Sequence, residues 1–142
     1  MKKVLFHLAL LLIIASNWKC ENMVLDHCCA KENLAVGKAK SAIDDFKPTL
    51  ERRTENLKVA NDELKDALAK QKQAVADRDA HPGDDSYEAA LRVANTILQA
   101  KIKNQEEKQT EFDKATAQMK ALTDALTLAE KALEECEKNC KH

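Results

Sequence analysis

The chain has 142 residues, of which 33% are charged and only 4% are aromatic, and its formal net charge at pH 7 is −1. Two glycines and two prolines are too few turn residues for an all-β fold, and the scarcity of aromatic side chains disfavours a deep ligand pocket. The near balance of 23 basic and 24 acidic residues offers no basic surface for nucleic acid. This composition is typical of long helices and coiled coils, so we expect one all-α domain.

The N-terminus has the pattern of an export signal. Lys2 and Lys3 give it a positive charge, and a run of apolar residues over 4–15 follows, interrupted only by His7. This run is too short for a helix that crosses a bilayer, so we expect no stable membrane insertion. We interpret residues 1–15 as a signal peptide, cleaved at about residues 15–20, and residues 16–27 as a short N-terminal segment of a secreted protein. A buried N-terminal helix is the alternative.

One cluster of turn residues interrupts the rest of the chain. Pro82 ends a helix that arrives from the N-terminal side, and Gly83 follows it directly. Asp85 can cap the next helix, because Glu88 lies three residues later as in a capping box. The sequence therefore predicts a turn over residues 79–86 with a long helix on each side.

Both helical segments carry the heptad pattern of a coiled coil. Seam residues recur at alternating steps of four and three from Cys29 to Arg78, and again from Tyr87 to Cys140. Pro48 lies within the first segment, where it predicts either a kink in the helix or a restart of it. Two long helices joined by one turn predict an antiparallel two-helix coiled-coil hairpin.

The cysteines fix the register between the two helices. When Cys29 faces Cys136, large side chains face small ones in many layers and the fold-back falls on the predicted turn. Residues 28–142 are then one hairpin whose open end is stapled by disulfides. We expect Cys29 to pair with Cys136 and Cys28 with Cys140; the swapped pairing, Cys28 with Cys136 and Cys29 with Cys140, stays open.

The cysteine content leaves two further alternatives. The fifth cysteine, Cys20, can be free, removed with the export segment, or paired between two chains. His27 and His142 would lie near the four cysteines, and clusters of cysteine and histidine bind zinc. Adjacent cysteines and a C-x3-C spacing are unusual for zinc, and an oxidising compartment competes for thiols, so we predict disulfides, no metal and no cofactor.

The predicted seam departs from a simple coiled coil in two places. Its middle third carries Lys101, Gln105 and Lys108 at seam positions, which weakens it. Near the turn the apolar stripe is wider than two helices need. These turn-proximal residues are a candidate interaction face, formed by Leu64, Leu68, Val75, Leu91, Ile97, Leu98 and Ile102. They can pack within the hairpin, join two hairpins in a homodimer, receive a helix of a partner protein, or bind an apolar ligand.

The sequence shows no pattern of catalytic residues. No histidine comes with a plausible nucleophile and an orienting carboxylate, and no glycine-rich phosphate loop is present. Asp44-Asp45 and Asp84-Asp85 suit capping and solvation better than a calcium cage. We therefore expect no enzyme but a secreted helical protein that binds an unknown extracellular protein, as a saliva, venom or body-fluid factor such as a toxin or effector. An extracellular carrier of a small apolar ligand is the alternative.

The first prediction concerns export. The secreted form should be oxidised and should lack about 15–20 N-terminal residues, because the apolar run has the length of a signal-peptide core. Intact-mass analysis of protein recovered from the culture medium of expressing cells measures both properties. A full-length product that stays with the cells would contradict the prediction.

Overall fold

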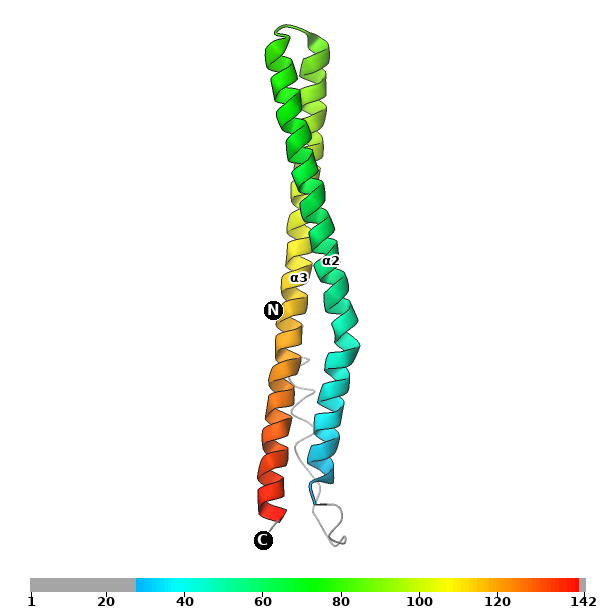
Figure 1. Cartoon of the computed structure of the whole chain (residues 1–142), viewed down its shortest axis with the longest axis vertical. Coiled ribbons are helices and arrows are strands. Elements are labelled where there is room, and N and C mark those ends of the chain that lie inside the picture. The colour runs from blue at the N-terminus through cyan, green and yellow to red at the C-terminus, as the bar shows by residue number, and fades with distance from the viewer. Residues whose placement is uncertain (1–27, 141–142) are drawn as a thin grey trace, which may run out of the picture.

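The computed structural model describes residues 28–140, which form two long helices joined by a short turn (Figure 1). Helix α2 spans Ala30–Ala80 and helix α3 spans Asp85–Cys140, with 51 and 56 residues. At 1.5 Å per residue each helix is about 80 Å long. The helices run antiparallel and side by side along this length, which confirms the predicted all-α hairpin. The predicted signal peptide and the segment 16–27 lie outside the described residues.

The seam between α2 and α3 follows the heptads read from the sequence. Every residue at a predicted seam position, from Cys29 to Arg78 and from Tyr87 to Cys140, is at least partly buried. The described residues with the least exposure all occupy these positions; they are Cys29, Val36, Ala60, Ala67, Leu91 and Ala115. The core is therefore a single stripe of seam side chains, and three of its six least exposed residues are alanines. Neither described helix has a stretch that is both long and apolar enough to cross a membrane.

Polar contacts between the helices show that the register holds from the open end to the turn. They join Lys40 to Glu130 at 3.8 Å, Arg53 to Glu111 at 2.5 Å, Glu63 to Lys101 at 2.9 Å and Gln71 to Asn95 at 3.3 Å. The residue numbers within each pair add up to nearly the same value as those of Cys29 and Cys136. No slip of one helix along the other therefore occurs between the cysteines and the turn.

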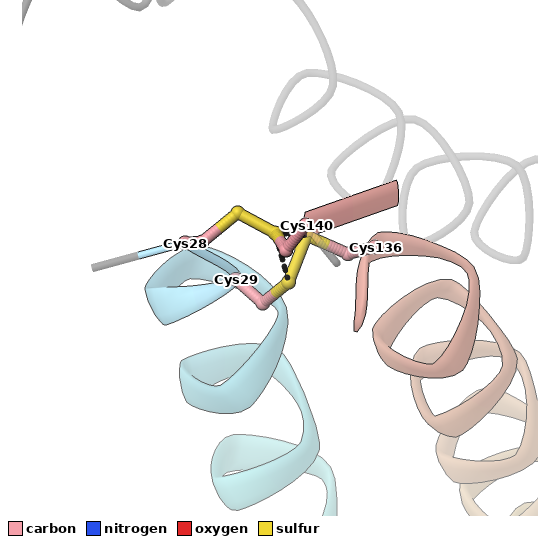
Figure 2. A group of neighbouring side chains, drawn as sticks. All are labelled: Cys28, Cys29, Cys136 and Cys140. Atoms are coloured by element: carbon pink, nitrogen blue, oxygen red, sulfur yellow. Dashed lines mark hydrogen bonds between the residues drawn. A yellow bond between two sulfur atoms is a disulfide. The ribbon is translucent and has the colours of Figure 1, made fainter. Parts of the chain in front are cut away.

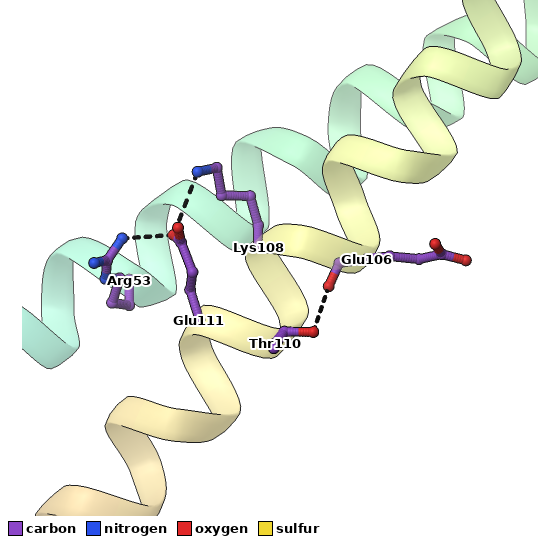
Figure 3. Close-up of polar contacts among 5 residues, drawn as sticks. All are labelled: Arg53, Glu106, Lys108, Thr110 and Glu111. Atoms are coloured by element: carbon purple, nitrogen blue, oxygen red, sulfur yellow. Dashed lines mark hydrogen bonds and ion pairs between the residues drawn. The ribbon is translucent and has the colours of Figure 1, made fainter. Parts of the chain in front are cut away.

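The middle of the seam is held by charges. Nη1 of Arg53 donates to Oε2 of Glu111, and Nζ of Lys108 reaches the same oxygen at 3.3 Å (Figure 3). The three side chains are 30–35% exposed. Ion pairs with this much contact with water contribute about 1 kcal/mol or less each, which is less than a well-buried leucine. The middle third is therefore satisfied electrostatically but only weakly stabilised.

Helix α2 passes through Pro48 without interruption, so the predicted restart of the helix is wrong. A proline has no N–H, which leaves the carbonyl group of Asp44 without its usual helical donor. Pro48 is exposed, at the heptad position farthest from the seam, where water can bind that carbonyl. Figure 1 shows a gradual curve of α2 in this region and no sharp kink.

A tight turn connects the two helices. The backbone N–H of Asp84 donates to the carbonyl oxygen of His81 at 3.3 Å, and Gly83 between them has a φ of 85°. Pro82 followed by a glycine of positive φ is the sequence of a type II turn. The His81 ring also stacks on the ring of Tyr87 with 4.2 Å between centroids, which ties the turn to the start of α3.

Asp84, and not Asp85 as predicted, caps helix α3. Its Oδ1 accepts hydrogen bonds from the N–H and the hydroxyl of Ser86, at 2.9 and 2.6 Å. These bonds hold the pKa of Asp84 below its usual value. The cap lies one residue earlier than expected because the carbonyl of Asp84 already accepts the helical N–H of Glu88, so Glu88 is one residue too far along for a capping box.

The polar seam generates a prediction about stability. Replacing Lys108 with leucine should raise the free energy of unfolding by about 1 kcal/mol, because the register places this position opposite Leu57 and a leucine would bury apolar surface there. Urea unfolding followed by circular dichroism measures the change. Lys103→Leu, at an exposed position of the same helix, is the matched control. A Lys108→Leu variant no more stable than this control would show that apolar burial does not limit the middle of the seam.

Candidate functional site

The four cysteines at the open end of the hairpin form one cluster (Figure 2). Cys28 and Cys29 directly precede α2, and Cys136 and Cys140 lie about one helical turn apart near the end of α3. Disulfides join Cys28 to Cys140 and Cys29 to Cys136, with Cα–Cα distances of 6.2 and 5.8 Å. The structure thus contains the pairing preferred from the sequence and not the swapped one.

Cys29 has an unusual backbone that explains how two adjacent cysteines reach the same helix. Among the non-glycine residues that the structure describes, it is the one with a positive φ, 70°. This left-handed conformation costs an L-residue about 1–2 kcal/mol. Here it lets the side chains of both Cys28 and Cys29 turn toward α3, and the bond from the buried Cys29 to Cys136 holds it in place.

The sulfur atoms of the cluster are crowded together. All four Sγ atoms lie within 4.8 Å of one another. Besides the bonded pairs, the Sγ of Cys140 is 3.4 Å from that of Cys29 and 3.8 Å from that of Cys136. Oxidised sulfurs carry no hydrogen, so the contacts drawn between the bridges in Figure 2 are van der Waals contacts. The swapped pairing is therefore close in space, although the structure does not adopt it.

An exposed ion pair lies on α3 beside the cluster. Nζ of Lys138 is 2.7 Å from Oε1 of Glu134, four residues earlier. The hydrogen bond between them raises the pKa of Lys138 and lowers the pKa of Glu134 from their usual values. Because the two charges neutralise each other, the pair stabilises the last turns of α3 and adds little net charge near the sulfurs.

Three residues of the predicted interaction face belong to the seam of the hairpin. Leu91 is buried, and Leu64 and Leu98 are half-buried at seam positions. These side chains pack between α2 and α3. They are therefore not available to a partner while the hairpin is closed.

The other four residues of the predicted face lie beside the seam. Val75 and Ile102 are half-buried, whereas Leu68 and Ile97 are 48% and 45% exposed. In heptad terms Ile97 is at a g position and the other three are at e positions. The predicted face is thus divided between the two sides of the seam.

The contact between Lys40 and Glu130 shows which residues share a side. Both are at e positions, and their ion pair shows that the e positions of α2 and α3 flank the same side of the seam. The same register places Leu68 opposite Ile102 near the turn, with Val75 one heptad beyond Leu68. Ile97 lies on the opposite side of the seam.

One exposed apolar residue next to this face was not predicted from the sequence. Val93 is 59% exposed, and it precedes Ile97 by one helical turn on α3. The two therefore form an apolar pair on the surface near the turn. The signal was in the sequence as an apolar residue at an outer heptad position, beyond the seam and flanking positions that define the predicted face. Other exposed large apolar residues of the described chain are Leu34, Val59 and Leu128.

Comparisons with models of protein families, with characterised proteins and with solved structures find no match to this chain. No family is therefore assigned, and function is inferred from the chain's own residues.

The cysteine geometry predicts that reduction of both disulfides lowers stability more than any single seam substitution. The bridges span 112 and 107 residues. One bridge that closes a loop of this size stabilises a protein by about 4.7 kcal/mol and the second bridge adds to this, whereas truncating a core leucine costs about 2–5 kcal/mol. Circular dichroism melts with and without reductant measure the difference. Equal melting temperatures would mean that the bridges do not stabilise the hairpin.

The two bridges should not add equally to this effect. Once Cys29 and Cys136 are joined, the bond between Cys28 and Cys140 closes only a ring of a few residues. Removing that second bridge by replacing Cys28 and Cys140 with serine should therefore cost about 2 kcal/mol, well below the loss on full reduction. A loss as large as that on full reduction would contradict this loop argument.

Proposed function

We propose that this protein is a secreted, non-enzymatic interaction protein that acts as a saliva, venom or body-fluid factor, a toxin or effector among them. It binds another extracellular macromolecule along the surface of a disulfide-stapled helical rod. The main support is the small interior of the described residues. Their core is one stripe of apolar side chains, and no polar or charged side chain is buried in it. Recognition by such a molecule would use side chains on its outer surface.

The electrostatics of residues 28–140 support a role without catalysis. Catalytic groups usually owe a shifted pKa to burial or to a charge partner within a cleft. The shifted pKa values in this part of the chain belong to Lys47, Asp84, Glu134 and Lys138, which are all exposed. Each shift has a local cause, a hydrogen bond to a neighbour on the same helix or cap. These pKa shifts are those expected of solvated ion pairs and a helix cap.

Two disulfides support the proposed secretion. Such bonds form and persist in oxidising compartments and are rare in the cytosol. They agree with the export pattern of the sequence, although residues 1–15 lie outside the described part of the chain. A staple at the open end also suits a small protein that must stay folded in a dilute fluid.

The contact region lies near the turn, at the end of the rod opposite the staple. Val93 and Ile97 form an exposed apolar pair on one side of the seam, and Leu68 is exposed on the other side. A partner helix with apolar side chains one turn apart fits such a pair. A second copy of the hairpin is one form that this partner can take, which would give a homodimer.

The carrier alternative has less support. An apolar ligand needs a concave surface lined mainly by apolar side chains. A shallow hollow on the surface of α3 is lined instead by charged and polar residues, which are Lys103, Glu106, Glu107, Thr110, Glu111 and Lys114. Native mass spectrometry of protein recovered from its own fluid tests this alternative directly, because a carrier would retain its ligand.

The interaction proposal predicts a selective loss of binding. In a capture experiment, the immobilised oxidised protein retains partners from the fluid into which it is exported. Changing both Val93 and Ile97 to glutamine should remove at least one of these partners and leave the melting temperature nearly unchanged, because both side chains are exposed.

A matched control comes from the open half of the rod. Changing Leu34 and Leu128, which are 58% and 67% exposed, to glutamine removes two other exposed apolar groups. This variant should retain the partners of the wild type. Sedimentation velocity of the same three proteins shows whether the partner is a second copy. Identical captured sets and identical sedimentation for all three would overturn the contact region, and a bound apolar small molecule would favour the carrier.

A further inference from the structure

We propose that the four clustered cysteines form a tetrahedral thiolate site for a soft divalent cation, Zn²⁺ above all, when their disulfides are reduced. The open end of the hairpin would then be closed by a metal in place of two covalent bonds. This inference rests on the geometry of the sulfur atoms and not on the function proposed above.

The spacing of the sulfurs suits zinc. With Zn–S bonds of about 2.3 Å, the corners of a ZnS₄ tetrahedron are about 3.8 Å apart. The Sγ of Cys140 already lies 3.4 Å from that of Cys29 and 3.8 Å from that of Cys136, to neither of which it is bonded, and all four sulfurs are within 4.8 Å. On reduction each bonded pair must separate by about 1.7 Å to reach the tetrahedral distance, which rotation of the side chains can supply.

The fold brings two ligands from each helix. Cys136 and Cys140 are separated by four residues within α3, so both sulfurs lie on one face, as do paired ligands four residues apart in helical zinc sites. The left-handed backbone of Cys29 directs both it and Cys28 to that face. The unusual spacing that disfavours zinc in the linear sequence is therefore converted by the fold into four converging donors.

The start of α2 favours thiolates at two of the four positions, and the exposure of the cluster leaves a route for the ion. Cys28 and Cys29 stand at the N-terminus of α2, where the helix dipole stabilises a negative sulfur. Cys136 and Cys140 lie at the C-terminal end of α3, where the dipole has the opposite sign. Cys28 is exposed, Cys136 and Cys140 are half-buried, and Cys29 is buried. A cation can therefore approach from the side of Cys28 and reach a largely shielded site.

The chemistry balances with a phosphine as reductant. Each disulfide and one phosphine take up one water molecule, which gives two thiols and one phosphine oxide. Binding of one Zn²⁺ to four thiols then releases four protons. The oxidised cluster holds no thiolate, so the staple and the metal site exclude each other.

The test uses the full mature chain with Cys20→Ser, so that the cluster supplies all of its thiols. The protein is reduced with a phosphine without oxygen, and Co²⁺ is added as a spectroscopic probe before Zn²⁺. We expect one metal per chain, the charge-transfer and visible bands of tetrahedral cobalt thiolate, and their loss when Zn²⁺ displaces Co²⁺. Zinc should also protect four thiols from alkylation and raise the melting temperature above that of the reduced metal-free chain.

Two variants decide whether the cluster is the site. Cys28→Ser removes one ligand and should weaken zinc binding by about tenfold or more. Asn139→Ser changes an exposed residue beside the cluster and should bind like the parent. Because the reduced chain can lose helix, circular dichroism accompanies each titration. The proposal is overturned by no metal uptake, by one metal shared between two chains, by equal affinity of Cys28→Ser, or by metal uptake without a gain in melting temperature. None of these results bears on binding by the oxidised protein.

Discussion

Two helices that touch along a single stripe bury little apolar surface, and this constraint shapes the whole molecule. Compact domains of similar length enclose a core on several sides, whereas here the least exposed residues form one line of seam positions. The stability of the hairpin therefore depends on constraints that lower the conformational entropy of its unfolded chain. Two bridges at the open end do so for almost the full length of the described residues.

Because the disulfides supply much of its stability, the hairpin is constrained most strongly at its two ends. The turn closes one end through Gly83 and the cap by Asp84, and the cysteines close the other. Between them the seam can tolerate Lys108 and Arg53, whose charges meet at Glu111 (Figure 3). Polar side chains in the middle of the seam destabilise the hairpin little, because the two helices cannot separate there while the turn and the disulfides join their ends.

The same architecture directs attention to the surface when function is considered. Large exposed apolar side chains are few among the described residues, and the pair of Val93 and Ile97 lies near the turn, at the opposite end of α3 from the cysteine cluster. The two ends of the rod thus have different chemistry, apolar contact at one and sulfur at the other. The binding proposed at the turn and the redox-dependent metal closure proposed at the open end would therefore be independent of each other.

The fold and its register could be predicted from the sequence, because heptads, turn residues and cysteines are local patterns that agree on one arrangement. It also favoured the disulfide pairing of Cys29 with Cys136, since both share the phase of the seam. Details that depend on backbone direction and on neighbours across the seam came from the three-dimensional structure. These are the cap at Asp84, the left-handed Cys29 that gathers four sulfurs, and the division of the apolar stripe into packed and exposed residues. A one-dimensional pattern gives the face on which a residue lies, but its exposure and the aim of its side chain depend on how closely the second helix approaches.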